Sequence, residues 1–197
     1  MADAVPTIVN VGYRSTNFWV VSAGRSRLLV DLGWPGRAGE LLANLERKGI
    51  PLNEIRYGLA THYHIDHAGA AQDLKQRGVP LLVLQEQVDA IPRMTQWIKP
   101  GDRYTTITTH DNVVIRAEES RTLLKRIGID GEILHTPGHS DDSVSLVLDI
   151  GCAFTGDLTR PDMIAQEDPA VVARSWKLLR DRGVTTVYGG HGPPYYL

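Results

Sequence analysis

Three histidines and one aspartate lie within six residues of one another in the stretch Thr61-His62-Tyr63-His64-Ile65-Asp66-His67. The short apolar run Ile55–Ala60 comes directly before this stretch and is typical of a buried strand. Imidazole and carboxylate groups are common ligands of zinc, iron and manganese. Their concentration at the end of a buried strand therefore indicates a metal site. A polar loop that is His-rich by chance is the alternative, and three further strand ends argue against it.

Three more predicted strands end in glycine-rich or polar turns, and these turns carry His139, Asp157 and His191. Sites in open α/β sheets form just beyond the carboxyl ends of strands, so we expect the four strand ends to converge on one metal centre. The candidate ligands are His62, His64, Asp66, His67, His139, Asp157 and His191. A catalytic zinc ion takes about three protein ligands and a water molecule. Seven ligands are therefore too many for one ion and suit two ions that share a carboxylate.

The composition excludes several other classes of protein. The chain has 197 residues, seven His and a single Cys, which rules out an intrachain disulfide and a Cys-rich zinc finger. The formal net charge of −2 gives no reason to expect a nucleic acid or an anionic membrane as a partner. The sequence also shows no membrane-spanning run and no signal peptide at its start. We expect a cytoplasmic protein with a small-molecule substrate, and make no prediction of its oligomeric state.

Strand and helix patterns alternate along the chain, which favours an α/β fold built of packed layers. No repeat or long linker interrupts the pattern, so we expect a single domain over residues 1–197. Residues 85–131 are the least regular stretch. The expected helices are Arg37–Lys48, Ala68–Arg77, Glu118–Ile127 and Pro169–Arg182, and the expected strands are Phe18–Ser22, Arg27–Asp31, Ile55–Ala60, Pro80–Leu84, Glu132–His135, Val144–Leu148, Cys152–Thr155 and Val184–Tyr188.

Taken together, these motifs resemble those of the metallo-β-lactamase superfamily. Its H-x-H-x-D-H signature stands here at residues 62–67, and its later T-P-G-H-S, G-D and G-H-G elements stand at 136–140, 156–157 and 190–192. The early strand that ends in Val-Asp-Leu-Gly at residues 30–33 is similar to the first motif of the family. The resemblance covers roughly residues 15–194. It implies an α/β fold of the four-layer αββα sandwich type, with two mixed sheets packed face to face and helices outside.

The resemblance also implies how the ligands divide between the two metals. His62, His64 and His139 would hold the first ion, Asp66, His67 and His191 would hold the second, and Asp157 would bridge them. Asp66 is also the catalytic candidate, because a carboxylate beside a bridging water can accept its proton. On the resemblance alone, Asp31 is the expected hydrogen-bond partner of a ligand histidine.

The implied function is that of a binuclear hydrolase, in which a metal-bridging hydroxide attacks an ester, lactone, thioester or amide. The expected cofactors are two divalent ions, with zinc first and iron or manganese as alternatives. The alternative function is an iron-dependent oxidoreductase of the same fold, similar to persulfide dioxygenases, and a non-catalytic metal-binding module is a third. A secreted β-lactamase would carry a signal peptide, and a glyoxalase II-type enzyme would add a C-terminal helical domain. We therefore expect a small esterase- or lactonase-like enzyme.

Several other residues are assigned structural roles or left open. His135 is expected to be a strand residue, His110 a surface residue and Cys152 a small core residue. Asp141 and Asp142 are expected in a solvated loop rather than as an acid–base pair. Trp97, Ile98 and Tyr104 lie in the irregular region, and both a substrate-lining role and ordinary packing stay open for them.

Overall fold

The computed structural model of the protein describes residues 5–163 and 166–197, and these residues build two mixed β-sheets. The six strands of the first sheet follow one another in space as they do in the sequence: β1 (Thr7–Asn10), β2 (Trp19–Ala23), β3 (Ser26–Val30), β4 (Ile55–Leu59), β5 (Leu81–Leu84) and β6 (Val113–Ile115). The second sheet has the spatial order β11 (Tyr195–Tyr196), β10 (Thr186–Gly189), β9 (Cys152–Gly156), β8 (Val144–Leu148) and β7 (Gly131–His135).

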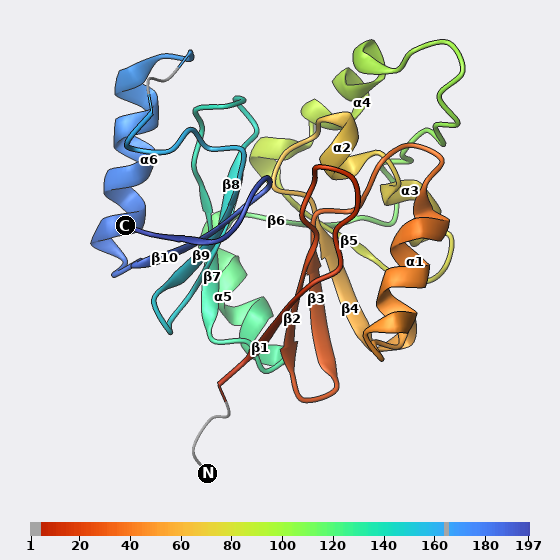
Figure 1. Ribbon diagram of the computed structural model, residues 1–197, viewed down its shortest axis with the longest axis horizontal. Helices are drawn as coiled ribbons and strands as arrows, with labels where there is room; N and C mark the ends of the chain where they lie inside the picture. Colours follow the sequence, from red (N-terminus) through yellow and green to blue (C-terminus); the bar gives the residue numbers. More distant parts are fainter. Residues whose placement is uncertain (1–4, 164–165) are drawn as a thin grey trace.

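Helices cover the outer face of each sheet (Figure 1). The first sheet carries α1 (Ala38–Arg47) and α3 (Ala71–Lys75), and the second carries α6 (Pro169–Asp181). The layers are thus helix, sheet, sheet and helix, which confirms the expected αββα sandwich. The remaining helices are α2 (Ile65–Ala68), α4 (Ala90–Arg93) and α5 (Ala117–Arg126), with 3₁₀ turns at Leu52–Glu54, Gln85–Gln87 and Met94–Trp97.

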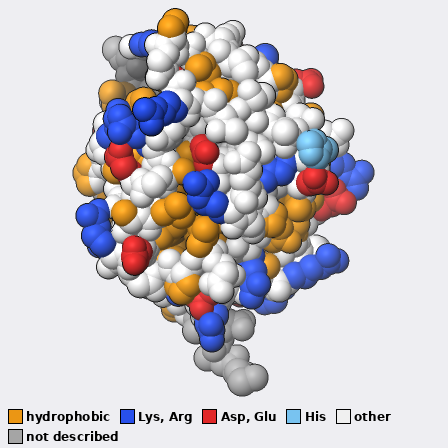
Figure 2. All heavy atoms as spheres, turned by 90° about the vertical axis from the view of Figure 1, so that its right-hand side faces the viewer, with side chains coloured by type: hydrophobic (Ala, Val, Ile, Leu, Met, Phe, Trp, Pro, Cys, Tyr) orange, Lys and Arg blue, Asp and Glu red, His pale blue; other side chains and the backbone are white. Residues whose placement is uncertain are grey.

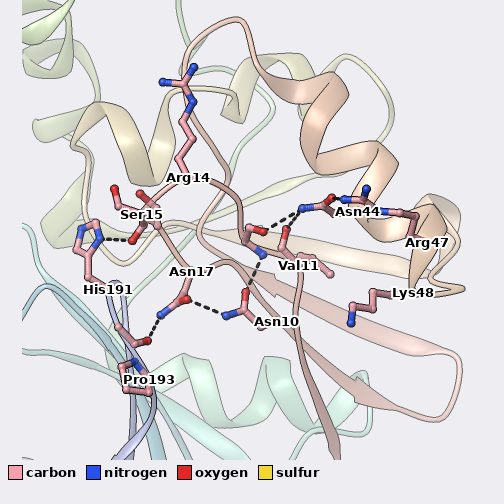
Figure 3. A pocket seen from close by; sticks show the side chains of 13 residues that line it. Asn10, Val11, Arg14, Ser15, Asn17, Asn44, Arg47, Lys48, His191 and Pro193 are labelled. Atoms are coloured by element: carbon pink, nitrogen blue, oxygen red, sulfur yellow. Dashed lines mark hydrogen bonds between the residues drawn. The ribbon is translucent and has the colours of Figure 1, made fainter.

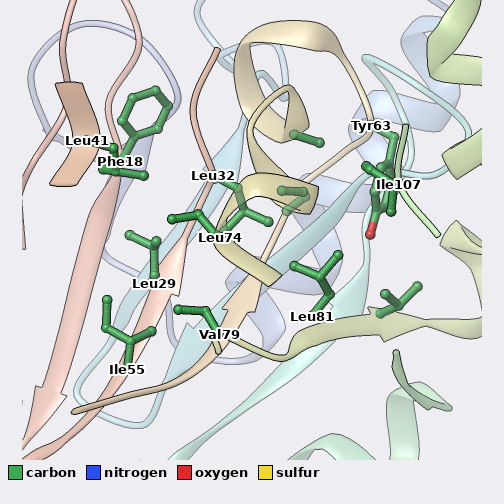
Figure 4. Packing of buried hydrophobic residues seen from close by; sticks show 14 of the residues in the cluster. Phe18, Leu29, Leu32, Leu41, Ile55, Tyr63, Leu74, Val79, Leu81 and Ile107 are labelled. Atoms are coloured by element: carbon green, nitrogen blue, oxygen red, sulfur yellow. The ribbon is translucent and has the colours of Figure 1, made fainter. Parts of the chain in front are cut away.

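Three clusters of buried apolar side chains hold these layers together. The cluster between the first sheet and its helices includes Phe18, which precedes β2, Leu29 of β3, Leu41 of α1 and Leu74 of α3 (Figure 4). The cluster between the two sheets is closed at one end by Leu124 of α5. In the third cluster Trp176 of α6 packs against the outer face of the second sheet. Figure 2 shows the solvent side of the α1 layer, where charged side chains of both signs lie scattered among apolar ones.

Strand directions bring the four predicted ligand-bearing turns to one rim of the sandwich. In the first sheet β4 runs parallel to β3 and β5. In the second sheet β7 and β9 both run antiparallel to β8, and β10 runs parallel to β9, so all three point the same way. The backbone N–H of Val144 donates to the carbonyl oxygen of Thr61 at 2.8 Å and joins the sheets at this rim. We call the carboxyl ends of β4, β7, β9 and β10, with their turns, the site rim.

The long elements match the sequence prediction, and the short ones were missed. The four predicted helices correspond to α1, α3, α5 and α6, although α3 begins only at Ala71 because a separate turn, α2, precedes it. The strands β1, β6 and β11 have only four, three and two residues, too few to show a pattern. The strand expected from Val184 begins at Thr186, since the backbone N–H of Val184 is bonded to the carbonyl oxygen of Leu179 at the end of α6.

The single domain over residues 1–197 stays a prediction of the sequence. Among the described residues, no helix combines the length and the apolar character that a bilayer span needs.

Candidate metal centre

The site rim brings all seven predicted ligand residues together. His62 and His64 follow β4, Asp66 and His67 lie on α2, and the other three residues follow β7, β9 and β10. Their ligand atoms form two groups, and within each group the atoms lie within 4.8 Å of one another. The three-histidine group consists of His62, His64 and His139, and the carboxylate group consists of Asp66, His67, Asp157 and His191.

In the carboxylate group two aspartates face two imidazoles. His67 Nε2 lies 3.4 Å from Asp66 Oδ2 and 3.3 Å from Asp157 Oδ1. His191 Nε2 lies 3.4 Å from Asp66 Oδ2 and 3.3 Å from Asp157 Oδ2. The second oxygen of Asp157 also lies 3.7 Å from His139 Nε2, so this carboxylate faces both groups.

In the three-histidine group the rings face one another edge to face. Their centroids are 4.6 Å apart between His62 and His64, and 4.8 Å apart between His139 and each of the other two. His139 Nε2 lies 3.0 Å from His64 Nδ1, so two ring nitrogens face each other directly. Such a set of convergent imidazoles is a typical arrangement of zinc ligands.

Asp31 orients the histidines of both groups from behind. One of its oxygens lies 2.9 Å from His67 Nδ1. The other accepts hydrogen bonds from the backbone N–H and the hydroxyl of Thr61, and this hydroxyl lies 3.2 Å from His62 Nδ1. A histidine that donates through Nδ1 presents the lone pair of Nε2 forward, which is how partners of ligand histidines fix the ring. His191 is held in a similar way, with its Nδ1 2.6 Å from the carbonyl oxygen of Ser15.

Two supporting contacts were missed by sequence reasoning. Thr16 donates its hydroxyl hydrogen to Asp66 Oδ2 at 3.2 Å and accepts a hydrogen bond from the indole N–H of Trp34. Thr16 lies 50 residues before Asp66 and belongs to no motif, so no sequence signal could have paired them. The expectation that Asp142 lies in a solvated loop is wrong, because its side chain is buried and accepts a hydrogen bond from the backbone N–H of Tyr63. Asp142 therefore holds the loop between His62 and His64.

Two glycines let the ligand-bearing turns approach closely. Gly156 has a φ of +54°, and a Cβ at this position would overlap the side chain of Thr61. A Cβ at Gly190 would overlap the carboxylate of Asp157 and the ring of His67. These positions require glycine because the turns after β9 and β10 lie against the ligand side chains themselves.

The hydrogen-bonding state of the buried atoms fits a bound cation. Among the described residues, five buried side-chain atoms have no hydrogen-bond partner: His62 Nε2, His67 Nε2, Asp157 Oδ1, Asp73 Oδ2 and the Tyr195 hydroxyl oxygen. Buried polar atoms without a partner are rare and costly in native proteins. The first three of these atoms belong to the two groups, so a metal ion is the partner that this donor set calls for.

The electrostatics separate the two groups. Burial lowers the pKa of His62 and of His64, which are therefore neutral near pH 7. Burial also acts to lower the pKa of His67, but the charge of Asp31 and the closeness of the Asp157 and Asp66 carboxylates raise it well above its usual value. Hydrogen bonds to Asp157 and Asp66 raise the pKa of His191 to about 10.

The two carboxylates shift in the opposite direction. Burial acts to raise the pKa of Asp66 and that of Asp157, but His191 and His67 outweigh it, and both pKa values fall well below the usual range. In the absence of a cation the carboxylate group therefore carries protons on its histidines. A divalent ion would take the place of these protons on binding.

The other residues singled out from the sequence lie apart from the two groups, with one exception. His135 Nε2 bonds to the carbonyl oxygen of Asp141, the ring of His110 is 74% exposed, and Cys152 belongs to the core between the sheets. Tyr104 packs against the cluster under α1. The exception is Trp97, whose ring centroid lies 5.8 Å from that of His64.

A cavity of about 500 Å³ adjoins the groups on the side of the second sheet. His139, Asp157 and His191 line it together with apolar side chains, which include those of Leu158 and Pro193. A substrate in this cavity would have an apolar portion in contact with the protein and a polar portion facing the ligand residues.

Comparison with known proteins gives the family. The sequence profile described as the metallo-beta-lactamase superfamily matches residues 11–191. The chain belongs to the metallo-β-lactamase superfamily. The matched range contains both groups of ligand residues.

Several curated relatives carry functional names, and two of them are a thioesterase and a hydroxyacylglutathione hydrolase. The chain is 33% identical to an atrochrysone carboxyl ACP thioesterase from Aspergillus fumigatus over 147 residues, which are 73% of this chain and 29% of that protein. It is 30% identical to a hydroxyacylglutathione hydrolase from Cupriavidus metallidurans over 155 residues, 74% of this chain and 49% of that protein. The chain thus spans half or less of the length of these relatives.

The same fold occurs in solved structures of the superfamily. The crystal structure of TTHA1623 in a di-iron-bound form superimposes with a TM-score of 0.72 at 24% identity, covering 96% of this chain and 94% of that one. A likeness at this level of identity establishes the shared fold.

Proposed function

We propose that this metallo-β-lactamase superfamily member is a binuclear metal-dependent hydrolase. His62, His64 and His139 would hold one divalent ion, Asp66, His67 and His191 the other, and Asp157 would contact both. One observation carries the proposal: seven ligand side chains form two adjoining groups whose buried ligand atoms lack other partners. The imidazole and carboxylate donors suit zinc, which is our expectation, with iron and manganese as alternatives.

The two metal ions would supply a water-derived nucleophile at neutral pH and polarise the oxygen of the scissile carbonyl. Asp66 lies in the carboxylate group, beside the position expected for the attacking water. We propose that Asp66 Oδ2 accepts the proton of this water. Thr16 donates to the same oxygen and is fixed in turn by Trp34. This contact keeps the carboxylate from turning away from the site.

We further propose a thioester or another activated acyl compound as the substrate. Support comes from the two relatives, whose names describe hydrolysis of an acyl carrier thioester and of an acyl glutathione. The apolar side of the cavity next to His139 offers room for an acyl chain. A cytoplasmic location stays a prediction of the sequence.

The test measures the hydrolysis of a small panel of substrates by the purified protein. The metal content of the same protein sample is also determined. The panel contains one acyl group as an ester, a lactone and a thioester. We expect metal-dependent hydrolysis that is lost in Asp66→Asn and retained in the matched control Asp141→Asn, an exposed carboxylate paired with Arg93. One iron per chain together with oxygen consumption on a persulfide, and no hydrolysis, would contradict the proposal and favour the oxidoreductase alternative.

A further inference from the structure

A second cavity, of about 470 Å³, lies on the side of the first sheet, and Ile65, the residue before Asp66, is part of its lining. Its lining contains four basic side chains, those of Arg14, Arg37, Lys99 and Arg103, and a single acidic one, that of Asp102. The chain as a whole carries a formal charge of −2. The concentration of positive charge is therefore a local feature of this cavity, which we call the basic cavity.

The basic cavity is connected to the ligand residues through its walls. Ile65 lines it and directly precedes Asp66, and Trp34 lines it and reaches Asp66 through the hydroxyl of Thr16. Arg14 lines it and directly precedes Ser15, whose carbonyl oxygen is bonded to His191. The wall formed by Trp34 and Ile65 therefore lies between the cavity and the carboxylate group.

The positive charge of the cavity is largely unbalanced. Arg37 pairs with Glu40 at 3.1 Å, and the Asp102 carboxylate accepts a hydrogen bond from the backbone N–H of Lys99. Within residues 5–163 and 166–197, the structure shows no ion pair for the other three basic side chains, which are those of Arg14, Lys99 and Arg103. Clustered cations without a counterion attract an anionic ligand.

The walls of the cavity are packed against each other. Gly36 has a φ of +63°, and a Cβ there would overlap the backbone and the Cβ of Arg103. The guanidinium of Arg14 lies over the ring of Trp34, 5.5 Å from its centroid. The segments that carry Arg14 and Arg103 are thus both positioned by the turn at Trp34–Arg37.

The larger cavity on the other side of the Arg14 loop is also basic. It has a volume of about 930 Å³, and Arg14, Arg47 and Lys48 line it together with three asparagines and His191. The test below therefore has to separate the two cavities. Figure 3 shows Arg14 extending from the loop away from Arg47 and Lys48. Asn44 is bonded to the carbonyl oxygens of Val11 and Gly12 and to Arg47, so the polar groups there support the loop.

We propose that the basic cavity binds a phosphate or carboxylate on the leaving group of the substrate, while the acyl portion lies in the apolar cavity beside His139 and Leu158. The substrate would then be an acyl compound of an anionic carrier, with its scissile carbonyl between the two cavities. This inference rests on the proposed hydrolytic function and adds the charge of the leaving group to it.

The test compares S-acetylpantetheine with its 4′-phosphate, which differ only in the phosphate, and includes S-acetylglutathione as a carboxylate probe. For the wild-type enzyme we expect a KM roughly 10-fold lower for an anionic thioester than for the neutral one, a preference that weakens at high salt. In Arg14→Gln/Lys99→Gln/Arg103→Gln the preference should vanish, and in the control Arg47→Gln/Lys48→Gln it should persist. Whether the phosphate or the carboxylates are preferred identifies the anion.

Calorimetric binding of 4′-phosphopantetheine and pantetheine separates the two claims. If no thioester is hydrolysed but 4′-phosphopantetheine binds tighter to wild type than to the triple variant, the proposed reaction fails and the anion site stands. Equal KM values for all three thioesters, or equal loss of preference in the control variant, would overturn the anion site.

Discussion

Charged side chains are arranged in opposite ways at the two ends of the sandwich. At the site rim, buried ligand atoms of His62, His67 and Asp157 face one another without hydrogen-bond partners. At the other end, which comprises the β2–β3 turn, the turn at Leu52–Glu54 and α5, several charged side chains form ion pairs within the chain. Glu54 there is bonded to Arg25 at 2.8 Å and to Arg27 at 3.1 Å. The paired end is complete as folded, whereas the rim needs a partner from outside the chain.

This difference separates function from stability. Native proteins satisfy their buried polar groups except at functional sites, where a local cost is offset elsewhere. Substitutions at the rim should therefore change metal content and activity, and substitutions at the paired end should change stability alone.

The largest expected effect is that of Asp157→Asn, because this carboxylate faces both ligand groups. Loss of a partner behind a metal ligand typically costs about 10–100-fold, and we expect removal of a shared ligand to cost at least about 100-fold in kcat/KM. Metal analysis of the same sample should show less than the wild-type content. Full metal content with wild-type activity would show that Asp157 does not join the groups.

At the paired end, Leu124→Ala should cost about 2–5 kcal/mol in the free energy of unfolding, because the side chain is fully buried between the sheets. Its exposed neighbour on α5 provides the control: Thr122→Ala should stay within about 0.5 kcal/mol. Denaturant unfolding measures both. The metal content of folded Leu124→Ala should equal that of wild type, and a lower content would break the separation between the two ends.

Asp31→Asn should weaken metal binding by about 10–100-fold, because it removes the carboxylate that orients His67. The backbone should be unaffected, since Asp31 has a φ of 65° and asparagine adopts that conformation readily. Competition with a chelator measures the affinity. Asp142→Asn, which retains an oxygen to accept from Tyr63, should have a smaller effect, and an equal effect would show that loop order rather than ring orientation decides the affinity.

The smallest expected effect concerns Glu54 and depends on pH. Hydrogen bonds from Arg27 and Arg25 lower the pKa of Glu54 below its usual value of 4.5. A lowered pKa in the folded state means that the pair stabilises the fold above the unfolded pKa and ceases to do so as the pH falls through the folded pKa. Wild type should therefore have a higher Tm than Glu54→Gln at pH 7, and the difference should shrink as the pH falls below 4.5. A Tm difference that does not change with pH would contradict this account.

The sequence predicted the fold and the ligand candidates because both have strong local signatures. The spacing of His62, His64, Asp66 and His67 is visible in one window, and the long helices show their apolar period. The supports of the site could not be predicted in this way. Thr16, Ser15 and Asp142 are polar residues in loops far along the chain from their partners, and only the packing of the two sheets brings them together. Short elements such as β6 depend on neighbouring strands rather than on their own pattern.

The central claim is that the rim holds two divalent ions, one of them through His139. Metal content per folded chain, measured for wild type and two histidine variants, tests it most directly. We predict about two ions for wild type and for His135→Ala, whose ring bonds to Asp141 outside both groups, and about one ion for His139→Ala. Equal metal content in His135→Ala and His139→Ala, or one ion in the wild-type protein under saturating metal, would contradict the account.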